Sequence, residues 1–255
     1  MEALTYRATA DLISKQGGVP YLSALARMVS DTPELREAYD ALLGGLRLSA
    51  AFNSGNSVLV TSTQSNEGKT TVASCLAITA SLAGYSVLLV DGDLRRPWLA
   101  PAAGIADAAG LGEVLEGVVE AAEAIHFVDL FADSREAGPI RVMTAGRRPP
   151  AFLPAVDWPK ARTMFQVISR PFGIVLFDSP PILAASDALL LAGVADGVLL
   201  VVGAGSAHRD EVRRAKEQLH QTGTPLIGAV LNQFDPKIHG RPGHPNYSHY
   251  RGFRR

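Results

Sequence analysis

The sequence predicts an α/β fold, a mostly parallel sheet flanked by helices on both faces, with a helical extension at the N-terminus. Short apolar runs rich in β-branched residues recur along the chain, and stretches with helical spacing of apolar residues separate most of them. Strands that alternate with helices in this way pair in parallel, and their ligands bind beyond the carboxyl ends of the strands. The predicted strands are 57–61, 87–90, 140–143, 174–177, 197–202 and 226–231, and the predicted helices are 69–83, 159–170, 186–194 and 208–220.

The composition indicates a globular protein of a reducing compartment. The 255 residues are 47% hydrophobic and 19% charged, with a formal net charge of −1, which does not suit a nucleic-acid-binding protein. A single cysteine, Cys75, excludes an internal disulfide framework. The first residues lack a secretory pattern, and the most apolar run, 188–205, contains Asp196 and several glycines. We therefore expect a soluble, cytoplasmic protein.

The N-terminal extension is predicted to cover residues 1–50. Its first part, 1–32, lacks a strong period and is expected to be loosely attached. Thr32 and Pro33 then form a cap and first-turn pair, and the apolar residues that follow at helical spacing predict an amphipathic helix ending before Phe52.

The sheet domain is predicted to cover residues 51–236. Its segment 98–150 is less regular, with a short helix expected near 111–124. Residues 237–255 contain five Lys or Arg, three His and no acid, and we expect them to form a flexible basic tail.

A phosphate-binding loop is predicted at residues 61–71, directly after a strand and directly before a helix. Gly68, Lys69 and Thr70 match the end of the P-loop pattern G-x-x-x-x-G-K-[ST], and Thr63 stands at the first glycine. In such a loop the backbone N–H groups bind phosphate oxygens, the lysine lies between the β- and γ-phosphates, and the hydroxyl binds magnesium. The expected ATP-binding residues are Asn66, Glu67, Gly68, Lys69, Thr70 and Thr71.

Three aspartates follow predicted strands at the same edge of the sheet as Lys69. Asp91 and Asp93 come after the second strand, and Asp178 directly follows the predicted strand Ile174 to Phe177. Charged groups at the end of a buried strand are costly unless they face a ligand or one another. A Mg-nucleotide site needs such acids, one to hold the metal and one to accept a proton. Their alternative role is to cap the segments that follow, and Asp93 is the most open to it.

With these motifs in place, the chain resembles the bacterial tyrosine kinases of capsule and exopolysaccharide synthesis, the CpsD/CapB type, over about residues 34–235. The most specific matches are VLLVDGDLRRPWL at 87–99 and FGIVLFDSPPILAASDALLLA at 172–192. The resemblance implies a P-loop kinase of the partition-ATPase-like fold that transfers the γ-phosphoryl group of ATP to tyrosines, normally in its own tail. It also implies a membrane-embedded polysaccharide co-polymerase as activating partner, recruitment to the inner face of the membrane, and self-association.

The same resemblance assigns roles to individual residues. Asp91 would activate the acceptor hydroxyl, while Asp93 and Asp178 would hold Mg²⁺ together with Thr70. Asn232 resembles an asparagine that related ATPases place near the adenine; the alternative is a turn residue. The phosphoacceptors would be Tyr247 and Tyr250. The residues assigned to catalysis are Lys69, Asp91, Asp93 and Asp178.

The chain also departs from the pattern of these kinases. The motif E-x-x-R-x-x-R, used for ring assembly, reads Glu37, Asp40 and Leu43 here, and the P-loop has Ser65-Asn66 where Pro-Gly is common. The tail carries only Tyr247 and Tyr250 where these kinases have a dense cluster of tyrosines. Two other functions therefore stay open: a regulator that binds nucleotide without kinase activity, and a partition-type or septum-positioning ATPase. The second is disfavoured by Gln64, which stands where those ATPases carry a lysine.

Overall fold

The computed structural model describes residues 20–49, 52, 55–106, 108–131, 138–147, 156–235 and 238. These residues form a seven-stranded sheet with the order β3-β4-β2-β5-β1-β6-β7, in which all neighbours are parallel except β3 and β4. The strands are β1 Ser57–Ser62, β2 Val87–Asp91, β3 Ile125–Val128, β4 Ile140–Met143, β5 Ile174–Asp178, β6 Gly197–Gly203 and β7 Leu226–Asn232. The predicted α/β class is confirmed.

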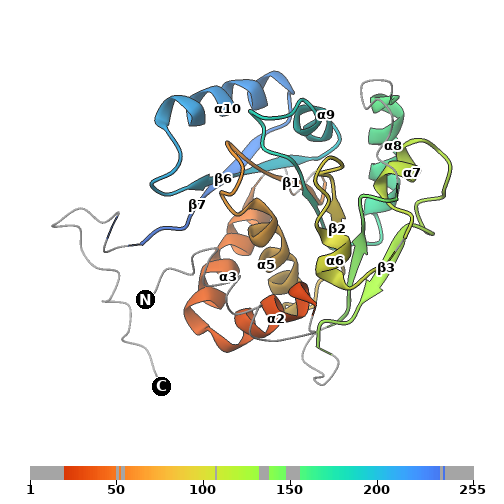
Figure 1. Ribbon diagram of the computed structural model, residues 1–255, viewed down its shortest axis with the longest axis horizontal. Helices are drawn as coiled ribbons and strands as arrows, with labels where there is room; N and C mark the ends of the chain where they lie inside the picture. Colours follow the sequence, from red (N-terminus) through yellow and green to blue (C-terminus); the bar gives the residue numbers. More distant parts are fainter. Residues whose placement is uncertain are drawn as a thin grey trace.

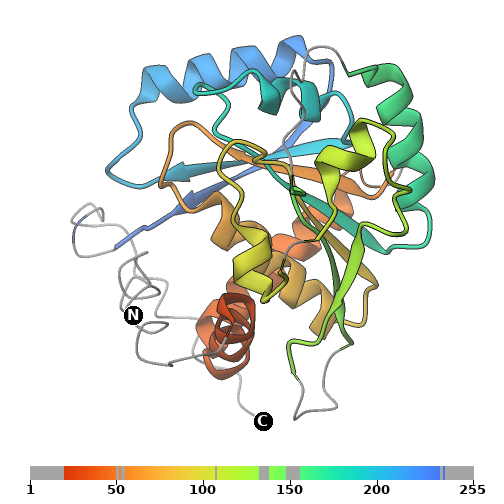
Figure 2. The same cartoon turned by 45° about the vertical axis from the view of Figure 1, so that its right-hand side comes forward.

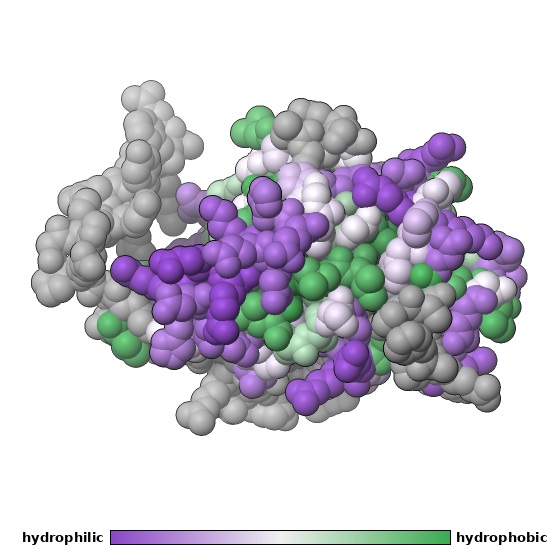
Figure 3. All heavy atoms as spheres, turned by 90° about the horizontal axis from the view of Figure 1, so that it is seen from above, coloured by the Kyte–Doolittle hydropathy of each residue, from purple (hydrophilic) through white to green (hydrophobic). Residues whose placement is uncertain are grey.

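Helices cover both faces of the sheet (Figures 1 and 2). One face packs against α2 Tyr21–Asp31, α3 Pro33–Leu48 and α5 Lys69–Leu82, and the other lies under α8 Trp158–Ser169, α9 Asp187–Ala192 and α10 Arg209–Gln221. The short helices α6 Leu99–Ala103 and α7 Leu111–Leu115 follow β2 in the chain. Seen from the side of α10, the surface is hydrophilic along that helix and apolar beside it (Figure 3). The helix is hydrophilic outside because its buried residues, Ala215 and Leu219, face inward.

The central strands read as unbroken apolar runs because both of their faces are buried. In β1, Val58 and Val60 belong to the core under α5, whereas Leu59 belongs to the core under α8 to α10. Helix α5 lies inside the fold, with all ten residues from Val72 to Ser81 buried. The P-loop is thereby held between a buried strand and a buried helix, which fixes its position.

The N-terminal segment differs from the expectation of loose attachment. Residues 21–31 form α2, whose Leu22, Leu25, Ala26 and Val29 are fully buried against the core. Their spacing of three, four and seven residues gives one apolar face of a helix. This pattern spans only eleven residues, and the mixed composition of 1–32 obscured it.

The region after β2 also differs from the prediction. The helix expected near 111–124 ends at Leu115, because Gly117 has a φ of 72°, which an α-helix cannot contain. The edge strand β3 and the short helix α6 were not predicted. β3 is only partly buried, with an exposed Phe127, so its sequence lacks the apolar run of a central strand.

No helix among the described residues is long and apolar enough to cross a membrane. The predicted phosphoacceptors Tyr247 and Tyr250 lie outside the described residues, as does the basic tail that carries them apart from Ile238.

Candidate nucleotide-binding site

The P-loop runs from the end of β1 to the start of α5 with two left-handed residues. Asn66 has a φ of 67° and Gly68, which precedes the first residue of α5, has a φ of 86°. Asn tolerates this conformation better than most residues. The Ser65-Asn66 sequence can therefore form the turn for which the related kinases use Pro-Gly.

Glu67 braces the back of the loop with its carboxylate. This side chain is 2% exposed and accepts hydrogen bonds from Thr63 Oγ1 at 2.7 Å, from Gln64 N at 2.9 Å and from Gly203 N at 3.2 Å. The third bond ties the loop to the end of β6. Glu67 was predicted to bind nucleotide; its carboxylate is committed to the loop itself, so the group left for a ligand is its backbone N–H.

Gln64, at the position where partition ATPases carry a lysine, is also engaged within the chain. Its Nε2 donates to Glu211 Oε1 at 2.9 Å, and the other oxygen of Glu211 accepts from His208 N at 3.2 Å. The hydrogen bond from the His208 backbone and then the one from Gln64 lower the pKa of Glu211.

Thr70 and Asp178 meet where β5 ends and α5 begins. Thr70 Oγ1 donates to Asp178 Oδ2 at 2.6 Å, while the buried Asp178 Oδ1 has no hydrogen-bond partner among the described residues. Burial raises the pKa of Asp178 to about 7, against the attraction of the Lys69 ammonium. A hydroxyl and an unpaired carboxylate oxygen are ligands that suit Mg²⁺, which takes one or two carboxylates and completes its shell with phosphates and water.

Lys69 and Asp93 lie beside this pair. Lys69 Nζ is 3.7 Å from Asp93 Oδ2, and Asp93 Oδ1 accepts from Arg96 N at 3.1 Å. Within the described residues no three His, Cys, Asp or Glu side chains cluster as a metal site.

Asp91 has the strongest structural role of the three aspartates. Its Oδ2 accepts from Trp98 N at 2.9 Å and Leu99 N at 2.8 Å, and its Oδ1 accepts from Asp93 N at 3.3 Å. Burial raises the pKa of Asp91 to about 6 in spite of these bonds. The capping role that the sequence offered mainly for Asp93 thus describes Asp91 better, although a raised pKa also suits a base.

Thr71 and Asn232, both predicted to bind nucleotide, have protein partners. Thr71 Oγ1 is 3.2 Å from the hydroxyl of Tyr21 on α2, and the Tyr21 ring packs edge-on against Trp98. Asn232 Nδ2 donates to the carbonyl of Glu67 at 2.8 Å. Helix α2 and the end of β7 therefore both contact the P-loop.

An ion pair that sequence reasoning missed joins the loop after β2 to α9. Arg95 binds Asp187 through two hydrogen bonds, Nε to Oδ2 at 2.5 Å and a second guanidinium nitrogen to Oδ1 at 3.2 Å. The Asp187 side chain is 2% exposed. Arg95 lies in the motif block 87–99 and Asp187 in the block 172–192, so both could have been marked as candidates. The sequence does not show that they pair.

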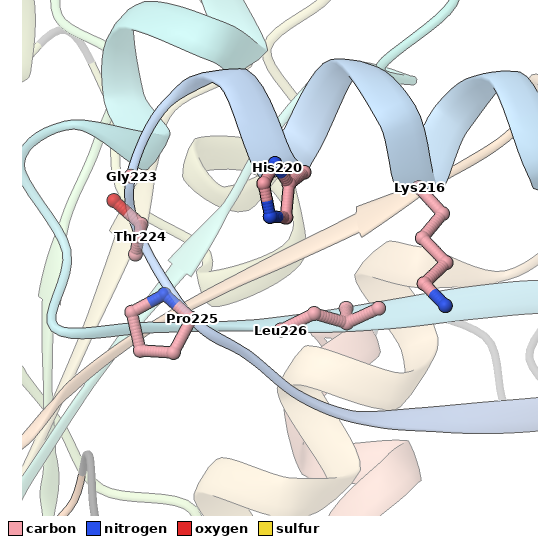
Figure 4. A pocket seen from close by; sticks show the side chains of 6 residues that line it. All are labelled: Lys216, His220, Gly223, Thr224, Pro225 and Leu226. Atoms are coloured by element: carbon pink, nitrogen blue, oxygen red, sulfur yellow. The ribbon is translucent and has the colours of Figure 1, made fainter.

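A separate pocket lies at the other end of β7, away from the P-loop. Lys216 and His220 of α10 project toward Leu226 over Pro225 (Figure 4). The predicted site residues do not line it.

The P-loop with carboxylates at the adjoining strand ends defines a P-loop nucleotide-binding protein. Residues 58–250 match the family model described as the CobQ/CobB/MinD/ParA nucleotide binding domain. The chain belongs to this family and, within it, to the bacterial tyrosine-protein kinases, as its resemblance to them predicted.

Individual relatives support this assignment. Tyrosine-protein kinase YwqD of Bacillus subtilis is 32% identical over 204 residues, which cover 77% of this chain and 80% of that protein. Tyrosine-protein kinase CpsD of Streptococcus pneumoniae serotype 4 is 28% identical, over 86% of this chain and 93% of its own. The kinase domain of Escherichia coli ETK superposes with a TM-score of 0.70 at 28% identity, covering 77% of this chain and 74% of that one. MinD of Pyrococcus horikoshii, complexed with Mg-ADP, shares the fold at 21% identity, with a TM-score of 0.58 and coverage of 69% and 70%.

Proposed function

We propose that this protein is an ATP-dependent protein-tyrosine autokinase that regulates the polymerisation and export of an exopolysaccharide or capsule. The observation that carries the proposal is the Thr70–Asp178 pair with its unpaired carboxylate oxygen, next to Lys69 and the Asp91/Asp93 loop. The family membership supplies the class of reaction.

In this site each residue has a distinct task. Mg²⁺, held by Thr70, Asp178 and Asp93, would neutralise charge on the β- and γ-phosphates of ATP. Lys69 would exchange its contact with Asp93 for the phosphates. Asp91, whose pKa is raised to about 6, is ionised at neutral pH and a stronger base than an ordinary aspartate.

The transfer itself is a single displacement. The phenolic oxygen of the acceptor forms a bond to the γ-phosphorus, and the bond from that phosphorus to the bridging oxygen breaks, so that ADP leaves. The phenolic proton passes to a carboxylate oxygen of Asp91. The acceptors proposed are Tyr247 and Tyr250, and the activator proposed is the cytoplasmic segment of a membrane-embedded polysaccharide co-polymerase.

Mass spectrometry of the protein incubated with Mg-ATP and that segment tests the proposal. We expect phosphate on Tyr247 or Tyr250 in the wild type and none in Lys69→Ala. The control Lys160→Ala removes an exposed lysine on α8 and should be phosphorylated as the wild type is. Wild-type protein that binds ATP but gains no phosphate, even with the activator segment, would rule out autokinase activity.

A second candidate is a regulator that binds nucleotide but does not phosphorylate, and the α3 helix favours it. Asp40, where the related kinases carry one ring-forming arginine, lies 4.0 Å from Arg36 of its own helix. Leu43, which stands at the position of the second ring-forming arginine, is buried in the core. Ring assembly through arginines at these positions is therefore closed to this chain. Tight ATP binding without turnover, even with the activator segment added, would select the regulator.

A further inference from the structure

Two consecutive side chains at the end of β7 hold two consecutive carbonyls of the P-loop. Asn232 Nδ2 donates to the carbonyl of Glu67 at 2.8 Å, and Gln233 Nε2 donates to the carbonyl of Asn66 at 2.9 Å. The partners are more than 160 residues apart in the chain. No role in the reaction proposed above accounts for this pair of contacts.

The contacts determine where the loop's N–H groups point. In a planar trans peptide the carbonyl and the N–H point in opposite directions. The carbonyl of Asn66 shares its peptide with the N–H of Glu67, and the carbonyl of Glu67 shares its peptide with the N–H of Gly68. Drawing both carbonyls outward toward β7 turns both N–H groups inward. Among the described residues neither N–H has an acceptor.

The backbone on both sides of the contact is strained. Asn66, with a φ of 67°, and Gln233, with a φ of 59°, are the two left-handed residues other than glycine in the described part of the chain. Such conformations persist where the surroundings enforce them, and they gather at ligand clamps. Gly68 lies so close to Asn232 that a Cβ there would collide with the amide nitrogen.

We propose that Asn232 and Gln233 are positioning residues, which hold the N–H groups of Glu67 and Gly68 ready for the phosphates of the nucleotide. This inference rests on the proposed nucleotide site and adds to it. It gives Asn232 a different task from the contact with adenine that its position in the family suggests. Phosphate binding to preset N–H groups loses affinity when the groups are free to turn.

The test compares the affinities of two ligands, one that carries adenine and one that consists of phosphates alone. Mg-ADP and magnesium tripolyphosphate, which lacks adenine and ribose, are titrated into wild type, Asn232→Ala and Gln233→Gly, with Gln221→Ala as an exposed glutamine control. Glycine at 233 keeps the left-handed backbone accessible while it removes the side-chain donor. Thermal unfolding of the ligand-free proteins is measured in parallel.

We expect each variant to bind both ligands about 3- to 10-fold more weakly, the loss of one average hydrogen bond. The control should bind as wild type does. If Asn232→Ala weakens ADP but not tripolyphosphate, the residue contacts adenine and the inference is wrong. It is also wrong if the variants unfold earlier yet bind normally, since their role is then structural. Wild-type protein that binds neither ligand would overturn the proposed function as well.

Discussion

Replacing Asp178 by asparagine should stabilise the nucleotide-free protein at alkaline pH while it abolishes phosphotransfer. Asp178 is buried, one of its oxygens has no hydrogen-bond partner among the residues described, and desolvation raises its pKa from 3.8 to about 7. Asparagine has the same shape and can still accept from the Thr70 hydroxyl, but it carries no charge. The functional site thus contains a charge that Lys69 and Thr70 compensate only in part in the metal-free fold.

The size and sign of the effect follow from the pKa. A rise of the pKa from 3.8 to about 7, at about 1.4 kcal/mol for each tenfold change in proton affinity, amounts to about 4 kcal/mol against folding when Asp178 is ionised in both states. Because the folded-state pKa is the higher one, the folded protein binds more protons between about pH 4 and pH 7, and its stability falls as pH rises through that window. The gain from asparagine should be about 4 kcal/mol at pH 8, less than half of that at pH 5, and close to zero below pH 4.

Urea unfolding in the presence of EDTA, from pH 4 to pH 8, measures this gain. Asp210→Asn on α10, where the side chain is exposed, is the matched control and should show no comparable pH dependence. In separate samples without EDTA, Mg-ADP should stabilise the wild type and leave Asp178→Asn nearly unchanged. A variant that gains nothing at pH 8, or gains as much at pH 4 as at pH 8, would show that Asp178 is not a desolvated charge.

Three further substitutions test other parts of the structure. Gly68→Ala should lower ADP affinity by more than 10-fold in calorimetry, because the methyl group meets the Asn232 amide. The control Gly84→Ala has a similar φ of 85° but open space around it, and it should only cost about 1–2 kcal/mol of stability. Leu25→Ala in α2 should cost about 3 kcal/mol in denaturant unfolding; a cost near zero would mean that α2 is not part of the core. Arg95→Ala should slow phosphotransfer by roughly 10- to 100-fold with ADP affinity unchanged, while Arg96→Ala should not, and equal rates in the two variants would contradict a positioning role for the Asp187 pair.

The sequence predicted the central strands closely because burial on both faces leaves a plain pattern. The predicted run 57–61 is β1 Ser57–Ser62, and 174–177 is β5 Ile174–Asp178. The edge strand β3 and helix α2 were missed for the opposite reason. The strand β3 is short and only partly buried, so it lacks an apolar run. Helix α2 has a clear apolar face, but this face spans only eleven residues and is preceded by a stretch of mixed composition.

The site shows the same division between what is local and what is distant. The P-loop and the three aspartates were found because parallel strands bring their carboxyl ends to one edge, so residue type and strand position suffice. Which oxygen meets which donor depends on contacts across the sheet. Asp91 and Asp93 could not be separated as base and cap from their spacing of two residues, because the difference lies in Trp98 and Leu99 folding back onto Asp91.

Asn66 and Asn232 show how a departure from a motif becomes intelligible only in three dimensions. On its own, Asn66 replaces a glycine at a left-handed position and should weaken the loop by the strain that a side chain adds. Its carbonyl, however, is held by Gln233, and the next one by Asn232, so the strained turn is supported from β7. A P-loop supported in this way needs less conformational freedom from glycine. Asparagine in place of glycine at position 66 is therefore explained by the hydrogen bonds from Asn232 and Gln233 at the end of β7.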